Sequence, residues 1–126
     1  MASSGALAGK RVLLVEDEVL VAMLIEDMLA DEDCVLVAHI ARLTDAIALA
    51  ADATVELDLA ILDVNVAGQP VFAVAEALAA RGVPFVFTTG YGPGALPAPW
   101  VGRPTLTKPF TMSGVVQALE RVLAGG

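Results

Sequence analysis

The sequence contains one cysteine, Cys34, which excludes an internal disulfide and a Cys-x-x-Cys metal site. Basic residues are also scarce: seven Lys and Arg against fifteen Asp and Glu give a net charge of −8. Nucleic acids are bound by clustered basic side chains, so we expect no nucleic-acid partner. An acidic surface likewise gains nothing from an anionic membrane. A chain without disulfides is typical of the reducing cytoplasm, where we expect this protein to act.

Long apolar runs are absent too. The stretch from Val12 to Ala30 is apolar on average, but acidic residues interrupt it and rule out a membrane span. Residues 1–9 lack the charged and apolar regions of a signal peptide and are predicted to form a flexible tail. The hydrophobic content of 57% is typical of a globular chain, and residues 10–124 are long enough for one core. We therefore expect a single domain without a linker to another.

Strand-like and helix-like runs alternate along the chain. The predicted strands are Arg11–Glu16, Val35–Ala38, Leu57–Leu62, Pro84–Thr88 and Thr105–Thr107. The predicted helices are Val19–Ala30, Leu43–Ala51, Gln69–Ala80 and Met112–Leu123, the last capped by Thr111 or Ser113. Such alternation favours a doubly wound α/β fold, with a five-stranded parallel sheet and helices on both faces.

Residues 90–104 contain four prolines and four glycines, so the fourth helix is predicted to be shortened or absent. Two large apolar residues in this segment, Leu96 and Trp100, admit two interpretations. They either anchor a partner or fold back over the core where the helix is missing.

Polar residues directly follow four of the predicted strands. They are Glu16-Asp17, Asp63, Thr89 and Lys108. The carboxyl ends of parallel strands meet at one edge of the sheet, which is the edge where open α/β sheets bind ligands. Crowded carboxylates repel one another unless a cation or a proton intervenes. A divalent metal with an incoming phosphoryl group accounts best for this set.

Asp63 is expected at the exposed end of a rigid strand, which suits a nucleophile that forms an acyl phosphate. Lys108 and Thr89 would contact phosphoryl oxygens. The predicted magnesium ligands are Asp17 and Asp63 directly, Glu16 through water, and the Asn65 carbonyl.

Each residue alone has an ordinary explanation. Glu16 and Asp17 suit a helix N-terminus, Asp63 and Thr89 suit turns, and Lys108 suits a solvated surface. Their joint placement after separate strands is what favours a site.

The chain resembles the receiver domains of two-component response regulators. The matching motifs are LLVEDE with Glu16-Asp17, LAILDVN with Asp63, VPFVFT followed by Thr89, and TLTKPF with Lys108. The resemblance spans Lys10 to Leu123 and implies the strand order 2-1-3-4-5. It further implies that Asp63 is the phosphoacceptor and Asp17 a direct Mg²⁺ ligand. Thr89 and Lys108 would couple phosphorylation to conformation, and Lys108-Pro109 is a candidate cis peptide.

Three departures from the usual receiver pattern stand out. Thr105 replaces the switch aromatic, and Ala67 replaces a proline. Residues 87–92, Phe-Thr-Thr-Gly-Tyr-Gly, resemble the Phe-Ala-Thr-Gly-x-Gly/Tyr signature of atypical, mostly stand-alone alphaproteobacterial receivers, with Thr88 in place of alanine. In such a receiver, Tyr91 either gates water or is a rim aromatic, and Asn65 and Tyr91 are candidates for tuning dephosphorylation.

The resemblance implies a sensor histidine kinase as phosphoryl donor. A receiver without an output domain signals by binding a downstream protein, and we expect a monomer or weak dimer. Two alternatives remain: a phosphate sink that drains a shared kinase, and a phosphorylation-independent binding module. An enzyme of the haloacid dehalogenase kind is disfavoured, because Asn65 stands where its second aspartate would be. Self-catalysed phosphorylation and dephosphorylation are the only catalysis expected.

Overall fold

A computed structural model of the chain describes residues 5–90 and 96–125. Its main sheet has five parallel strands in the order β2-β1-β3-β6-β7. Their bounds are β1 Arg11–Val15, β2 Val35–Ile40, β3 Leu59–Asp63, β6 Phe85–Thr89 and β7 Thr105–Thr107. Counted along this sheet alone, the order is 2-1-3-4-5, which confirms the predicted fold class.

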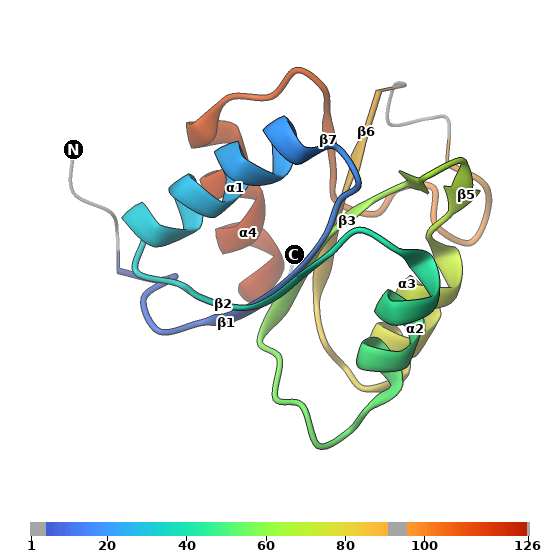
Figure 1. Ribbon diagram of the computed structural model, residues 1–126. Helices are drawn as coiled ribbons and strands as arrows, with labels where there is room; N and C mark the ends of the chain where they lie inside the picture. The colour runs from blue at the N-terminus through green and yellow to red at the C-terminus, as the bar shows by residue number, and fades with distance from the viewer. Residues whose placement is uncertain (1–4, 91–95, 126) are drawn as a thin grey trace.

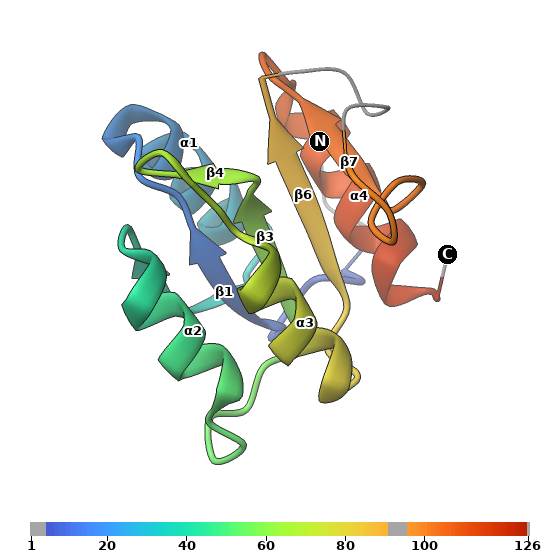
Figure 2. The ribbon, with the colours of Figure 1, turned by 90° about the vertical axis from the view of Figure 1, so that its right-hand side faces the viewer.

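Helices cover both faces of the sheet (Figures 1 and 2). One face carries α1 (Val19–Asp31) and α4 (Met112–Leu123), and the other carries α2 (Leu43–Ala51) and α3 (Phe72–Ala80). Every residue of β3 and β6 is buried, because the helices on each side shield both faces. No helix within the described ranges combines the length and apolar character needed to cross a membrane.

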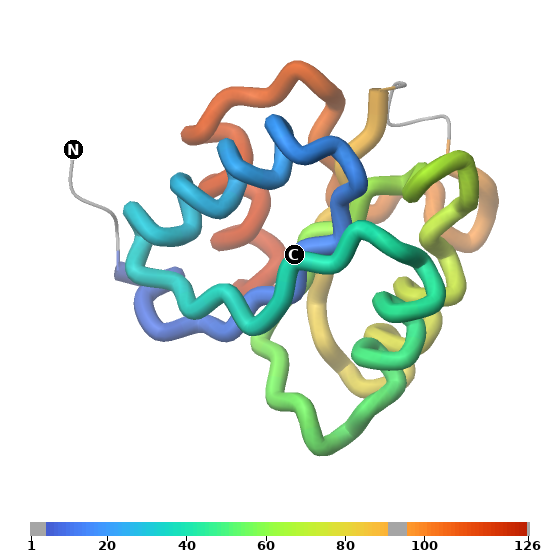
Figure 3. Tube along the Cα trace, in the orientation of Figure 1, coloured from blue at the N-terminus to red at the C-terminus, as the bar shows by residue number. Residues whose placement is uncertain are grey.

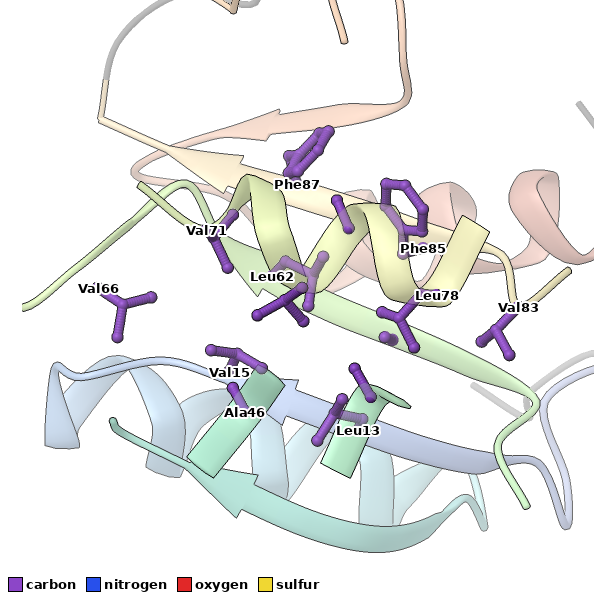
Figure 4. Close-up of a cluster of buried hydrophobic side chains, with 14 of the residues drawn as sticks. Leu13, Val15, Ala46, Leu62, Val66, Val71, Leu78, Val83, Phe85 and Phe87 are labelled. Atoms are coloured by element: carbon purple, nitrogen blue, oxygen red, sulfur yellow. The ribbon is translucent and has the colours of Figure 1, made fainter. Parts of the chain in front are cut away.

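Each face has its own hydrophobic core. On the α2/α3 face, Leu13, Leu62 and Phe87 pack against helix residues such as Leu78, as the side chains in Figure 4 show. On the α1/α4 face, residues one position along the strands, such as Leu14 and Ile61, pack against α1 and α4. This alternation fixes which strand residues face which pair of helices.

The start of α3 differs from the prediction. Gln69 and Pro70 were expected to open this helix, but they form β5, which pairs antiparallel with β4 (Asn65–Val66). Ala67 and Gly68 form the turn between them, with φ values of 51° and 84°. Positive φ at both central residues is the geometry of a tight hairpin turn. The hairpin uses residues through Pro70, so α3 begins at Phe72.

Other boundaries agree more closely. Leu43–Ala51, Thr105–Thr107 and Met112–Leu123 are elements with the predicted bounds. The Thr111 hydroxyl caps α4 by accepting the Gly114 N–H at 3.0 Å. Lys108-Pro109 is cis, as the resemblance implies. Leu7 is buried against the α1/α4 core, so the ordered packing begins before Lys10.

The described part of the β6–β7 connection, residues 96–104, contains turns and no helix. Leu96 and Trp100 are buried on the α2/α3 face, so they fold back over the core. The Trp100 ring stacks on Phe72 with centroids 6.1 Å apart and meets Phe87 edge-on at 6.0 Å. The Arg103 guanidinium lies 5.4 Å from the Trp100 ring centre. Within residues 96–104, an aromatic anchor therefore takes the place of the fourth helix, which was predicted to be shortened or absent.

We predict that Trp100→Ala lowers the free energy of unfolding by about 3–5 kcal/mol, since it removes a buried aromatic and leaves a cavity. Urea denaturation followed by far-UV circular dichroism measures this without a tryptophan signal. Val101→Ala, at a residue that is 52% exposed, is the matched control and should change stability by less than about 0.5 kcal/mol. Equal losses in the two variants would contradict the anchoring role.

Candidate functional site

Four strands deliver polar side chains to one edge of the sheet. Glu16 follows β1, Asp63 ends β3, Thr89 ends β6 and Lys108 follows β7. In Figure 2, β1, β3 and β6 run in the same direction and end at this edge. The convergence predicted from the sequence is therefore present.

Lys108 lies at the centre of the cluster. Its Nζ is 3.2 Å from Asp63 Oδ2, 3.5 Å from Glu16 Oε1 and 3.4 Å from Glu18 Oε1. Its backbone N–H donates to the Thr89 carbonyl at 2.7 Å, which ties β7 to the end of β6. One ammonium group thus contacts three carboxylates. Glu18 is not among the residues predicted for the site, although its position next to Asp17 was a usable signal.

Asp63 is more buried than expected. It was predicted to be exposed at the sheet edge, but it is only 5% exposed. The cause is its orientation: Leu59 and Ile61 pack on the α1/α4 face, and Asp63 follows them at the same spacing. Its Oδ1 accepts the Asn65 N–H at 3.1 Å, while Oδ2 faces Lys108. The carboxylate is therefore held on both sides.

The β4–β5 hairpin holds the second acidic residue. Asp17 Oδ2 accepts the backbone N–H of Ala67 at 2.9 Å, across 50 positions of the chain. The tube in Figure 3 shows this hairpin passing beside the β1–α1 loop. This contact is not predictable from side-chain type, because the donor is a backbone N–H. The exchange of the usual proline for Ala67 was the available signal, because proline has no N–H to donate.

Burial and crowding shift the titration of two groups. Glu16 is 1% exposed, and burial together with a hydrogen bond to Asp63 raises the pKa of Glu16 to about 7. Burial acts to lower the pKa of Lys108, but the neighbouring Asp63 and Glu16 carboxylates outweigh it and raise the pKa. Lys108 therefore stays charged at neutral pH.

The donor set fits a hard divalent cation. Glu16, Asp17 and Asp63 can offer carboxylate oxygens that all lie within 4.8 Å of one another. A cavity of about 400 Å³ opens over them, lined by Asp17, Glu18, Asp63, Asn65, Gly90 and Lys108. Its volume admits a metal ion with its waters and a phosphoryl group. Asn65 lies at the rim, where its carbonyl was predicted to complete the ligand set.

The remaining predicted residues are less fully defined. Thr89 is 4% exposed at the end of β6, and Tyr91 lies outside the described residues.

His39, near the end of β2, was not predicted as a site residue but contacts the backbone of one. Its Nε2 is 2.9 Å from the Glu16 carbonyl oxygen, and its Nδ1 is 3.2 Å from Glu26. It thus supports the backbone of Glu16 from the side and does not enter the cavity lining.

Comparison with solved structures identifies the family. SdrG from Sphingomonas melonis Fr1 is 43% identical, with 94% of this chain and 98% of that chain covered and a TM-score of 0.79. SdrG from Pseudomonas melonis Fr1, in its BeF3-activated conformation, is 44% identical over 92% and 98% of the chains, with a TM-score of 0.74. The receiver domain of the response regulator PhyR from Erythrobacter litoralis is 29% identical over 94% and 93%, with a TM-score of 0.78.

This chain belongs to the response regulator receiver domains. It is a receiver of the SdrG and PhyR type, a family of phosphorylatable signalling domains rather than classical enzymes. Neither a protein-family model nor a curated protein sequence matched it. At the level of fold alone, it also matches the receiver domain of the histidine kinase PA1611 from Pseudomonas aeruginosa PAO1. That domain is 23% identical, with 93% and 99% covered and a TM-score of 0.76, and it holds a magnesium ion in its active site cleft.

The raised pKa of Glu16 predicts a pH-dependent stability of this receiver. Between the ordinary value of 4.5 and about 7, folded Glu16 holds a proton that the unfolded chain has released. Without metal, stability should therefore fall as pH rises through this window and level off above it. Thermal unfolding in chelator at several pH values measures the trend. Because a metal competes with the proton, Mg²⁺ should raise the Tm more at about pH 8 than at about pH 6.

Glu16→Gln is the control for this effect, because glutamine has no proton to lose. It should remove the decline within the window. A decline of the same size in this variant, or a stability that rises across the window in the parent protein, would assign the effect elsewhere.

Proposed function

We propose that this receiver accepts a phosphoryl group from a sensor histidine kinase onto Asp63 with Mg²⁺ bound, and signals by phosphorylation-dependent binding to a downstream protein. The observation that carries the proposal is the contact of Lys108 Nζ with Asp63 Oδ2 at 3.2 Å beneath an acidic cavity. This one point brings together a phosphoacceptor, a cation for the phosphoryl group and oxygens for a metal.

The proposed phosphoryl transfer requires a nucleophile, cationic groups and one hydroxyl. An oxygen of Asp63 forms a bond to phosphorus, the phosphorus–nitrogen bond of the donor phosphohistidine breaks, and the imidazole leaves with the electron pair. Lys108 then turns its ammonium to a phosphoryl oxygen, and the Thr89 hydroxyl contacts another. Bound Mg²⁺, held by Asp17, Asp63, Glu16 through water and the Asn65 carbonyl, would neutralise charge on the phosphoryl oxygens. The BeF3-activated structure of the similar SdrG supports a phosphoryl-accepting site.

An apolar surface beside the site supports docking of the kinase. Four residues of α1 are exposed although apolar: Val19, Leu20, Met23 and Leu24. A second cavity of about 330 Å³ lies between this helix and the segment after β7, lined by Glu18, Val21, Leu24, Lys108, Pro109 and Phe110. Lys108 lines both cavities, so a partner on α1 would sit next to the phosphoacceptor. This continuity points to the phosphoryl donor as the occupant.

Signalling would follow from the new charge on Asp63. When Lys108 turns to the phosphoryl group, its backbone tie to Thr89 can carry the movement to β6 and β7. We propose that residues 96–107 then present a changed surface to the downstream protein.

The division into a tail over residues 1–9 and a receiver domain over residues 10–124 also stays a proposal. Leu7 packs on the core, so the tail would be ordered at its end nearest the domain.

We predict that incubation with acetyl phosphate and Mg²⁺, or with a phosphorylated histidine kinase, adds one phosphoryl group, measured by intact mass. Asp63→Asn should abolish the gain, because an amide is not a nucleophile for phosphorus. A chelator should abolish it as well. Asp45→Asn, at an exposed aspartate of α2, is the matched control and should be phosphorylated like the parent. A gain that survives in Asp63→Asn, or none from either donor, would overturn the proposal.

A further inference from the structure

One buried polar atom at this site has no role in the proposed transfer. Thr88 is 1% exposed, and its Oγ1 makes no hydrogen bond within residues 5–90 and 96–125. A buried hydroxyl without a partner costs free energy, and valine, which has the same shape, would avoid that cost. Alanine is the usual residue in the motif that this segment resembles. The hydroxyl therefore calls for an explanation other than packing.

The sheet places this hydroxyl beside the phosphoacceptor. Thr88 is the register partner of Asp63 across the β3–β6 pair. Val86 and Ile61, two positions earlier on each strand, both pack in the α1/α4 core. Because side chains alternate along a strand, Thr88 and Asp63 project from the same face of the sheet. Adjacent strands lie about 4.8 Å apart, so a hydroxyl and a carboxylate in this relation are within reach of a rotamer change.

The donors around Asp63 change when the site is used. At rest, Oδ1 accepts from Asn65 and Oδ2 faces Lys108. In the proposed transfer, Lys108 turns to the phosphoryl group, and one oxygen of Asp63 becomes bonded to phosphorus. The carboxyl group then loses its contact with the ammonium while it remains largely buried, and the Asn65 N–H and the proposed Mg²⁺ are its remaining partners. A new donor on the β6 side would compensate for that loss.

We propose that Thr88 is this donor: a positioning residue whose hydroxyl hydrogen-bonds the Asp63 carboxyl group in the phosphorylated state. The inference rests on the proposed function and adds a residue to it. It also explains why the Thr88 hydroxyl makes no hydrogen bond at rest within the described part of the chain, since its partner becomes free only after Lys108 has moved. The Thr88 hydroxyl thus lowers the stability of the resting protein and stabilises the position of the Asp63 carboxyl group in the phosphorylated one.

Thr88→Val and Thr88→Ser test the proposal with two measurements. Thr88→Val removes the hydroxyl and keeps the shape, so the metal-free protein should gain about 3 °C or more in Tm. The same variant should bind beryllofluoride with Mg²⁺ about tenfold more weakly, the value of one lost hydrogen bond. Thr88→Ser keeps the donor, and its beryllofluoride affinity should lie within about twofold of the parent. If Thr88 had a purely structural role, Thr88→Val would change the Tm without weakening beryllofluoride binding, and Thr88→Ser would have no affinity to restore.

The outcomes separate this inference from the proposed function. If the parent protein binds beryllofluoride, Asp63→Asn does not, and Thr88→Val matches the parent, then only the role of Thr88 falls. If Thr88→Val lowers the Tm, the hydroxyl has a partner at rest, and the inference also falls. If the parent binds no beryllofluoride in the presence of Mg²⁺, the proposed function and the role of Thr88 fall together.

Discussion

The contact between one lysine and three carboxylates is the interaction on which the rest of this site depends. Lys108 reaches Glu16, Glu18 and Asp63 within 3.5 Å, and Asp17 lies in the same cluster. One positive charge does not balance four carboxylates, and the pKa of Glu16 is raised, chiefly by burial and further by its neighbour Asp63. A divalent cation would resolve it more fully, and an incoming phosphoryl group would give Lys108 a new partner. The resting site thus carries an excess of negative charge, which a bound metal ion would reduce.

The fold holds these charged side chains close together without requiring flexible segments to become ordered. Parallel strands shielded on both faces are rigid, and their carboxyl ends carry the functional side chains to fixed positions. The β4–β5 hairpin adds a second constraint by holding Asp17 through a backbone N–H. On the α2/α3 face of the sheet, Trp100 covers the core in the segment where the fourth helix was predicted to be shortened or absent. Backbone contacts therefore preorganise the site together with the contacts between its side chains.

The sequence predicts the sheet, its helices and the converging residues, because apolar runs and the polar residues after them are local patterns. The hairpin is not predictable in the same way. Gln69-Pro70 is a good helix start on its own, and only the pairing of residues 65 and 66 with 69 and 70 decides otherwise. The burial of Asp63 and the amide of Ala67 depend on contacts between distant segments. For Trp100, the sequence leaves two environments open, and packing against Phe72 selects one.

Paramagnetic relaxation by Mn²⁺, followed by NMR of the backbone amides, tests the central claim most directly. Mn²⁺ prefers the same oxygen ligands as Mg²⁺, and it broadens only nearby signals. The account predicts that substoichiometric Mn²⁺ first broadens the amides of Asp17, Asp63, Asn65 and Lys108, that excess Mg²⁺ reverses this, and that Asp17→Asn weakens it. Broadening that instead begins at other acidic groups, such as Glu56 and Asp58 at the opposite edge of the sheet, would contradict a metal site at the Lys108 cluster.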